Sequence, residues 1–236
     1  MDTRHRQMLL DLKPEQPPTL DNFVVGANAE LVARLRGLGS TGSFEALYLW
    51  GDPGCGKSHL LAAAAASAHG RRPVVRLHAS EAAAELPLAT GSLLVIDDIQ
   101  QLGAGAQVAL FRAFNAMRFL GLAVLLAGRE PPLRLDLRED LRTRIGQCLI
   151  YEVRALSESE KDAALRRHAL LRGMKLDDGV VQYLMRHGRR DLPSLMAMLD
   201  ALDRGSLEQK RQPTVPLLRE LMQTSLELDN DEPGAV

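Results

Sequence analysis

A phosphate-binding loop gives the strongest chemical signal in this sequence. Residues 51–58 are Gly-Asp-Pro-Gly-Cys-Gly-Lys-Ser, and they satisfy the P-loop pattern, with a strand-like run before them and an alanine-rich helical run after them. Such glycines let the backbone point successive N–H groups at one anion, and the following helix adds the positive end of its dipole. Lys57 is then expected to reach the β- and γ-phosphates of a nucleotide, and the Ser58 hydroxyl to bind Mg²⁺.

The sequence around this loop disfavours the alternative of a chance glycine-rich turn before Lys-Ser. We therefore predict a site for a nucleoside diphosphate or triphosphate. Its candidate residues in the loop are Gly51, Asp52, Pro53, Gly54, Cys55, Gly56, Lys57, Ser58 and His59.

Two carboxylates end a second strand-like run further along the chain. The apolar residues 93–96 precede Asp97 and Asp98, and a continuous apolar run is typical of a strand buried on both faces. In P-loop proteins such a strand brings an aspartate to Mg²⁺, and Asp97 is the candidate for that role. Asp98 points elsewhere and is a candidate to polarise the attacking water. The alternative, a polar strand end without a function, is disfavoured because a P-loop lies upstream.

Short apolar runs alternate with helical patterns up to residue 151. Strands are expected at about 46–50, 73–77, 92–97, 122–127 and 148–152, and helices at about 28–38, 57–69, 106–119 and 138–145. This alternation predicts an α/β fold with a parallel sheet covered by helices. Ser157 and Glu160 then form a capping box that opens a purely helical region. Its helices are expected at about 157–171, 177–187, 192–204 and 214–223.

These patterns divide the chain into four segments. Residues 1–18 are polar with a proline-rich end and are expected to form a flexible segment. Residues 19–154 are the α/β domain, and residues 155–225 are a small all-α lid domain. Residues 226–236 are acidic and are expected to be a disordered tail.

The composition excludes several classes of protein. The formal net charge is −1, from 29 Lys and Arg against 30 Asp and Glu, so no global field draws the chain to nucleic acid or to an anionic membrane. Cys55 and Cys148 are too few for a disulfide framework, and no Cys/His spacing resembles a metal site. No signal peptide is visible, and the longest apolar stretch, residues 120–127, is far short of a membrane span. We expect a cytoplasmic protein that contacts DNA only indirectly, through its partners.

Several segments resemble the DnaA-related branch of the AAA+ ATPases, over roughly residues 19–222. Residues 19–26, Thr-Leu-Asp-Asn-Phe-Val-Val-Gly, are similar to the segment that flanks the adenine in the replication initiator DnaA. The resemblance therefore assigns Val24 and Val25 to the base. Residues 94–100 resemble the same family, in which Asp-Asp stands in place of the more usual Asp-Glu.

A further segment implies an arginine finger. Residues 140–146, Asp-Leu-Arg-Thr-Arg-Ile-Gly, resemble the segment that carries the finger of this family, which places that catalytic group at Arg144. The neighbouring Arg142 belongs to a stretch of interleaved charges, which is usually a solvated, salt-bridged face. We interpret Arg142 as part of that face.

Two departures from the family pattern bear on the chain's own ATP turnover. The sensor-2 arginine of the family aligns with Pro193, and Arg190 or Arg189 is the nearest replacement. The polar sensor-1 position falls near Gly128 and Arg129 and has no secure counterpart. We expect a weak own ATPase activity at most, with ADP or ATP as the bound nucleotide.

The N-terminal residues 7–12, Gln-Met-Leu-Leu-Asp-Leu, are similar to the peptides with which replication proteins bind the DNA sliding clamp. Gln7, Leu10 and Leu12 are the anchor positions. The alternative is a chance match or an amphipathic turn, but the proline-rich linker behind the peptide favours docking. The sequence after the helical domain is too short for a base-reading DNA-binding domain.

These features together resemble the regulatory members of the family, which inactivate the initiator. The resemblance implies the DnaA initiator and the sliding clamp as partners, and it allows a homo-oligomer. The implied activity is to promote hydrolysis of ATP bound to DnaA, which negatively regulates replication initiation. The alternative is a helicase-loading ATPase that acts on the replicative helicase and single-stranded DNA, which has no need of a clamp peptide. A scaffold without a catalytic contribution is a third possibility, and the finger-like Arg144 disfavours it.

Overall fold

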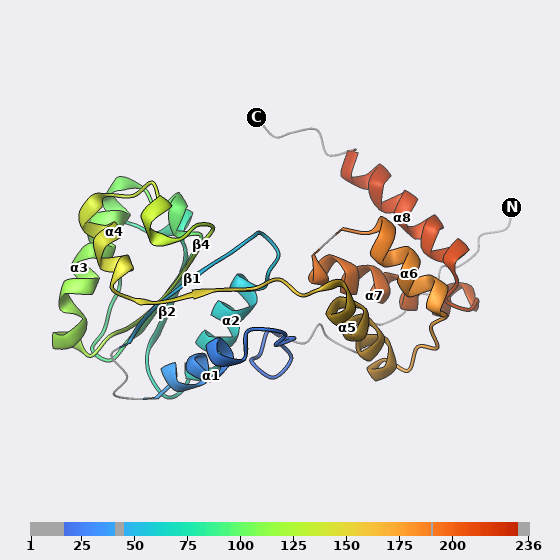
Figure 1. The fold of residues 1–236 in the computed structure, drawn as a ribbon, viewed down its shortest axis with the longest axis horizontal. Coiled ribbons are helices and arrows are strands. Elements are labelled where there is room, and N and C mark those ends of the chain that lie inside the picture. The colour runs from blue at the N-terminus through green and yellow to red at the C-terminus, as the bar shows by residue number, and fades with distance from the viewer. Residues whose placement is uncertain (1–16, 41–44, 190, 231–236) are drawn as a thin grey trace, which may run out of the picture. The chain divides into compact units, whose positions relative to one another are not determined.

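The computed structural model describes residues 17–40, 45–189 and 191–230, the side chains of 224–230 excepted. The described residues form two compact units, one from Pro17 to Ala155 and one from Leu156 onward (Figure 1). The sequence places this boundary between residues 154 and 155.

Five parallel strands form the sheet of the first unit, in the order β2-β3-β4-β1-β5. The strands are β1 (Ala46–Trp50), β2 (Val74–His78), β3 (Leu93–Asp97), β4 (Ala123–Gly128) and β5 (Leu149–Glu152). Each lies where an apolar run predicts it, so the parallel α/β fold is confirmed. Because all strands point the same way, the loops after β1, β2, β3 and β4 meet at one edge of the sheet, where ligands of such folds bind.

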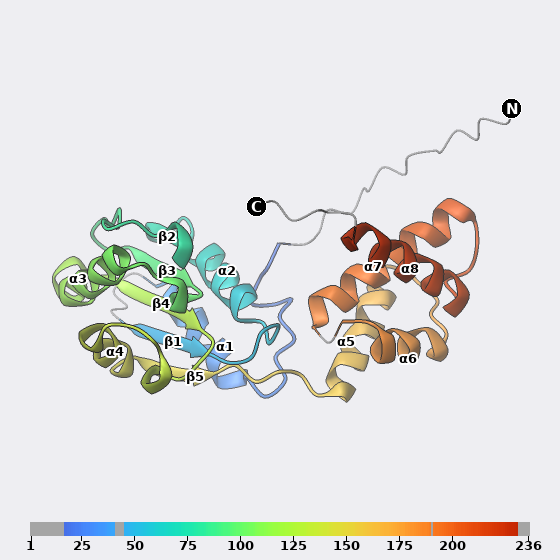
Figure 2. The same ribbon diagram turned by 90° about the horizontal axis from the view of Figure 1, so that it is seen from above.

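Helices cover both faces of this sheet (Figure 2). One face carries α1 (Ala29–Leu38) and α2 (Lys57–Ala68), and the other carries α3 (Ala104–Leu120) and α4 (Glu139–Gly146). Short 3-10 turns follow three of the strands: η1 (Ala79–Glu81), η2 (Ile99–Gln101) and η3 (Pro132–Arg134).

Strand β3 supplies both hydrophobic cores of this unit. Leu93 and Val95 pack with α1 and α2, whereas Leu94 and Ile96 pack with α3 and α4, and all four are fully buried. Successive side chains of a strand point to opposite faces. The next residue, Asp97, therefore continues the row that faces α2.

Four helices form the second unit around a leucine-rich core. They are α5 (Glu158–Leu171), α6 (Asp178–His187), α7 (Leu192–Gln209) and α8 (Val215–Asn230). Both bonds of the predicted capping box are present: Ser157 accepts the Glu160 N–H, and the Glu160 carboxylate accepts the Ser157 N–H. Helix α8 continues to Asn230, inside the segment that the sequence predicts to be a disordered tail from residue 226. No helix in the described ranges is long and apolar enough to cross a membrane.

Candidate nucleotide-binding site

The loop between β1 and α2 has the backbone that the P-loop pattern predicts. Gly51, Gly54 and Gly56 have positive φ angles of 150°, 79° and 103°, a region that favours glycine because it has no Cβ. A Cβ at Gly51 would also lie 2.7 Å from the carbonyl oxygen of Val153, just beyond β5. The loop therefore lies directly against the segment that follows β5, with no room for a side chain at Gly51.

Lys57 places its ammonium group inside this loop. The side chain is 7% exposed, and Nζ donates hydrogen bonds to the carbonyl oxygens of Gly51 at 2.7 Å and Asp52 at 2.8 Å. Nζ also lies 3.6 Å from the Cys55 Sγ. An ammonium carries three donors and no acceptor, so a phosphate oxygen entering the loop would meet a positive charge already directed at the loop. Ser58 follows on the first turn of α2 and is exposed.

The segment assigned to the base is attached to the end of the sheet by Asn28. This residue is 4% exposed; its Nδ2 donates to the Arg154 carbonyl and its Oδ1 accepts the Arg154 N–H, both at 2.9 Å. Asn28 precedes α1 but makes no capping bond, because its amide is used here. Val24 and Val25 are both half-buried in the same segment. The sequence gives no sign of this role, since an Asn before a helix normally serves as an N-cap.

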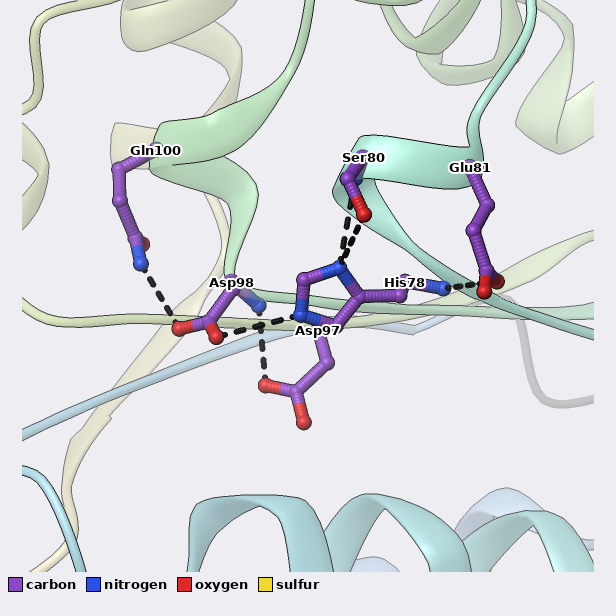
Figure 3. A network of polar contacts seen from close by, with 6 residues as sticks. All are labelled: His78, Ser80, Glu81, Asp97, Asp98 and Gln100. Atoms are coloured by element: carbon purple, nitrogen blue, oxygen red, sulfur yellow. Dashed lines mark hydrogen bonds and ion pairs between the residues drawn. The ribbon is translucent and has the colours of Figure 1, made fainter. Parts of the chain in front are cut away.

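The two carboxylates after β3 face different ways. The Oδ1 of Asp97 accepts the backbone N–H of Asp98 at 2.9 Å, and Figure 3 shows the Asp97 carboxylate turned away from Ser80 and Gln100. Asp98 has a left-handed backbone, with φ 52° and ψ 48°, which is more accessible to Asp than to most residues. The left-handed turn directs its side chain to β2 and η2 instead.

Asp98 is held by two residues that sequence analysis did not identify. Its Oδ1 accepts from Gln100 Nε2 at 2.7 Å, and its Oδ2 lies 3.3 Å from His78 Nε2 (Figure 3). The N–H of Ser80 donates to His78 Nδ1, so Nδ1 is an acceptor and the ring proton lies on Nε2, facing Asp98. A carboxylate oxygen accepts more than one hydrogen bond, so Asp98 keeps the capacity to orient a water. In the sequence, His78 is visible only as a polar residue at the end of β2. The register of β2 against β3 is what places His78 beside the turn at Asp98.

Gly128, near which the expected sensor-1 position falls, has no room for a side chain. A Cβ at Gly128 would collide with the hydroxyl of Tyr48, which donates to the Glu130 carbonyl. Burial raises the pKa of Tyr48, so this hydroxyl stays protonated and remains a donor. A larger residue at 128 has no room, which explains why the sequence offers no polar group there.

Arg144 lies in the last turn of α4 and leans on α3. Its Nη2 donates to Asn115 Oδ1 at 2.8 Å, and its guanidinium carbon lies 5.9 Å from the ring centroid of Phe111. A guanidinium has five N–H donors, so the bond to Asn115 leaves donors for a second acceptor. The stem is therefore held in place by α3 while the planar fork can still bind an anion.

No group of three or more His, Cys, Asp or Glu side chains is gathered in the described ranges. The predicted Mg²⁺ ligands are Ser58 and Asp97. Mg²⁺ typically takes one or two protein oxygens and completes its shell with phosphate oxygens and waters. The residues present therefore fit a magnesium ion that arrives with a nucleotide.

The fold recurs in solved structures. Domain III of the Thermotoga maritima replication initiation protein DnaA has a TM-score of 0.73 and 18% identity, over 90% of this chain and 98% of that chain. AMPPCP-bound DnaA from Aquifex aeolicus has a TM-score of 0.64 and 23% identity, over 84% of this chain and 68% of that one. The Thermotoga maritima RuvB branch migration motor has a TM-score of 0.68 and 19% identity, over 88% and 72%. At these identities the likeness shows the fold, which is that of the AAA+ proteins.

The helical unit gives a more specific match. Residues 158–222 match the family described as "Hda, lid domain". The helical unit therefore carries an Hda-type lid, and it follows an α/β unit with the fold of the DnaA structures.

The residues expected to align with the sensor-2 region lie in this helical unit. Pro193 lies in the first turn of α7, where Asp191 caps the helix by accepting the Ser194 N–H at 2.9 Å. Proline suits this turn because its missing N–H has no partner inside the helix, and it brings no charge. The Arg189 side chain is 80% exposed, with Nε 3.7 Å from the Asp191 carboxylate. Arg190 lies outside the described residues, as do Gln7, Leu10 and Leu12.

Proposed function

We propose that this chain is a regulatory AAA+ protein that binds adenine nucleotide with Mg²⁺, docks on the DNA sliding clamp and promotes hydrolysis of ATP held by the initiator DnaA. Such an activity lowers the amount of ATP-bound initiator and so restrains replication initiation. We expect it in the cytoplasm, in contact with DNA only through its partners.

One observation carries the proposal: an Hda lid follows an AAA+ domain of the DnaA type. Three features support a nucleotide as the ligand. They are the P-loop backbone, the buried Lys57, and the place of Asp97 in the row of β3 side chains that faces α2. The Aquifex aeolicus DnaA structure is described as AMPPCP-bound, which supports an adenine nucleotide in particular. The Arg144 donors that the bond to Asn115 leaves unused support a role in trans.

Lys57→Ala is expected to abolish stabilisation by nucleotide. A ligand at about 100 times its Kd stabilises the folded state by about 2.7 kcal/mol, and a chain of this size gains about 2–4 °C in Tm per kcal/mol. We therefore expect ADP with Mg²⁺ to raise the wild-type Tm by about 5–11 °C. The Tm of the Lys57→Ala variant should not change when ADP is added. Thermal melts with and without ADP measure this. The control is Lys161→Ala, which removes a lysine paired with Glu158 in the lid. If ADP raised the Tm of Lys57→Ala as much as that of wild type, the nucleotide would bind elsewhere.

Replacing Gln7, Leu10 and Leu12 together by Ala is expected to eliminate clamp binding and to leave the Tm and ADP binding unchanged. The leucines would fill an apolar pocket and the glutamine would hydrogen-bond at its rim, as in other extended peptides that dock by anchor side chains. Surface plasmon resonance on immobilised clamp measures the affinity. Undiminished clamp affinity in the triple variant would contradict the assignment of this peptide.

The test of the whole function is the nucleotide bound to the initiator. DnaA loaded with labelled ATP is incubated with the chain and DNA-loaded clamp, and the ratio of bound ATP to ADP is measured over time. We expect conversion to ADP only when the chain and the clamp are both present. Co-purification with the replicative helicase, together with an unchanged ATP ratio, would instead favour the helicase-loading alternative.

A further inference from the structure

Phe23 and His59 connect the two halves of the candidate site within the unit of residues 17–155. Their ring centroids are 5.5 Å apart and the ring planes are tilted by 47°. Phe23 belongs to the segment assigned to the base, whereas His59 lies in the first turn of α2, next to Ser58 and close behind Lys57. A contact between these rings therefore joins the base side of the site to its phosphate side.

Phe23 also lies directly against the phosphate loop. A Cβ at Gly56 would be 2.8 Å from Phe23 Cε2, so the ring touches the loop's backbone with no space between them. Gly56 is the N-cap of α2 and has a φ of 103°. Glycine has the widest choice of backbone conformations, so an uncovered Gly56 would be free to change the direction of the neighbouring N–H groups. The ring restricts that choice.

His59 fixes the segment that carries Phe23. Its Nε2 lies 3.0 Å from the Thr19 carbonyl oxygen, and because a carbonyl only accepts, Nε2 carries the proton and donates. Thr19 and Asn22 exchange two hydrogen bonds, at 2.9 and 3.1 Å. Leu20, between them, is 7% exposed in the core formed with α1 and α2. Phe23 is therefore held from the preceding turn, and His59 adds one of the contacts that hold this turn.

We propose that Phe23 and His59 are positioning residues that hold the phosphate loop in its anion-binding shape from the base side. The proposal rests on nucleotide binding at the P-loop, the first part of the proposed function. Its consequence is specific: loss of the Phe23 ring weakens the binding of ligands that contain only the phosphates, as well as the binding of complete nucleotides. Binding is weakened because the loop must then be ordered when the ligand arrives, and that entropy is subtracted from the affinity.

The test compares ADP with inorganic pyrophosphate, each with Mg²⁺, on the full-length chain. Trp50 is the only tryptophan of the sequence and is the last residue of β1, immediately before Gly51, so its fluorescence reports on both ligands. We expect Phe23→Ala to raise the Kd for ADP and for pyrophosphate by a similar factor, about tenfold, which corresponds to about 1.4 kcal/mol. Phe23→Leu restores an apolar cover and is expected to recover most of both affinities. Phe119→Ala, which removes a ring that is 90% exposed in the same unit, is the control and should change neither.

A further result bears on the coupling between the rings. Phe23→Ala and His59→Ala combined should raise the Kd by less than the product of their separate factors, because the effects of contacting residues are not additive.

If Phe23→Ala weakens the binding of ADP but not of pyrophosphate, the ring contacts the base alone, and the proposal is overturned. Unchanged affinity for both ligands overturns it as well. Should Phe23→Ala not fold, His59→Ala decides: the proposal expects it to weaken the binding of both ligands, and a loss confined to ADP, or no loss at all, would overturn the proposal. If wild type binds neither ligand, or Lys57→Ala binds both normally, the proposed function fails instead.

Discussion

Arg144→Ala is expected to abolish the stimulation of DnaA-bound ATP hydrolysis and to leave ADP binding and clamp binding unchanged. An arginine finger supplied in trans contributes about 10³–10⁵ in rate. At 1.36 kcal/mol per decade this is about 4–7 kcal/mol of transition-state stabilisation. The measurement is the initial rate at which DnaA-bound ATP becomes ADP when the variant is added with DNA-loaded clamp.

The geometry around Arg144 explains why lysine should not replace it. Asn115 and Phe111 hold the guanidinium stem and one edge of the fork, and the remaining donors are fixed in one plane. An ammonium keeps the charge but loses the planar fork that fits two phosphate oxygens. We therefore expect Arg144→Lys to recover little of the rate.

Arg142→Ala is the matched control on the same helix. It removes an arginine that we interpret as part of a solvated, charged face, so it should stimulate hydrolysis as wild type does. Wild-type stimulation by Arg144→Ala would exclude the mechanism in trans. The helicase-loading alternative would then become the leading hypothesis.

The sequence predicts the elements of this fold because most of their signals are local. The strands of the parallel sheet are continuous apolar runs, and Ser157 with Glu160 marks the start of α5 through a hydrogen-bond pair within one turn. The end of α7 shows the limit of such signals. The helical pattern ends at about 204, before Gly205, a residue of low helix propensity. In the structure the helix continues to Gln209, because Gly205 is buried against Leu221 of α8.

The candidate site divides in the same way. The P-loop is contiguous, so its glycines and Lys57 are identified from sequence alone. Asn28 and Arg154, by contrast, are 126 residues apart, and both α1 and β1 lie between Phe23 and Gly56 in the sequence. His78 reaches Asp98 because β2 lies next to β3 and not next to β1. Contacts that depend on strand order and register leave no pattern in a single sequence.

Replacing Arg72 should strongly destabilise the α/β unit. Arg72 is 7% exposed, and its guanidinium donates to carbonyl oxygens of Gly91 at 2.7 Å, Ser92 at 3.1 Å and Gly121 at 3.1 Å. It also donates to the carbonyls of Leu38 at 3.2 Å and Ser40 at 3.5 Å. These carbonyls precede β3, β4 and β1, so one side chain joins three loops at the amino ends of the strands. Burial lowers the pKa of Arg72, but arginine remains charged at neutral pH.

Arg72→Met is expected to lower the free energy of unfolding by about 3 kcal/mol. Hydrogen bonds from a charged group contribute about 1.5–3 kcal/mol each, not additively, and buried carbonyls left without a donor add a penalty. Arg72→Lys should cost about 2 kcal/mol, because one ammonium cannot reach all three loops as the fork does. Urea unfolding followed by circular dichroism measures both values, and Arg71→Met, which changes the exposed neighbour, is the control.

The same variant separates stability from function. Arg72 joins loops at the amino edge of the sheet, whereas the P-loop and Asp97 lie at the carboxyl edge, where ligands of such folds bind. At a temperature where Arg72→Met is still folded, its Kd for ADP should therefore equal that of wild type. Stability equal to that of Arg71→Met would mean that water replaces the guanidinium at these carbonyls. A weakened Kd without loss of stability would mean that the two edges of the sheet are coupled, and would contradict this expectation.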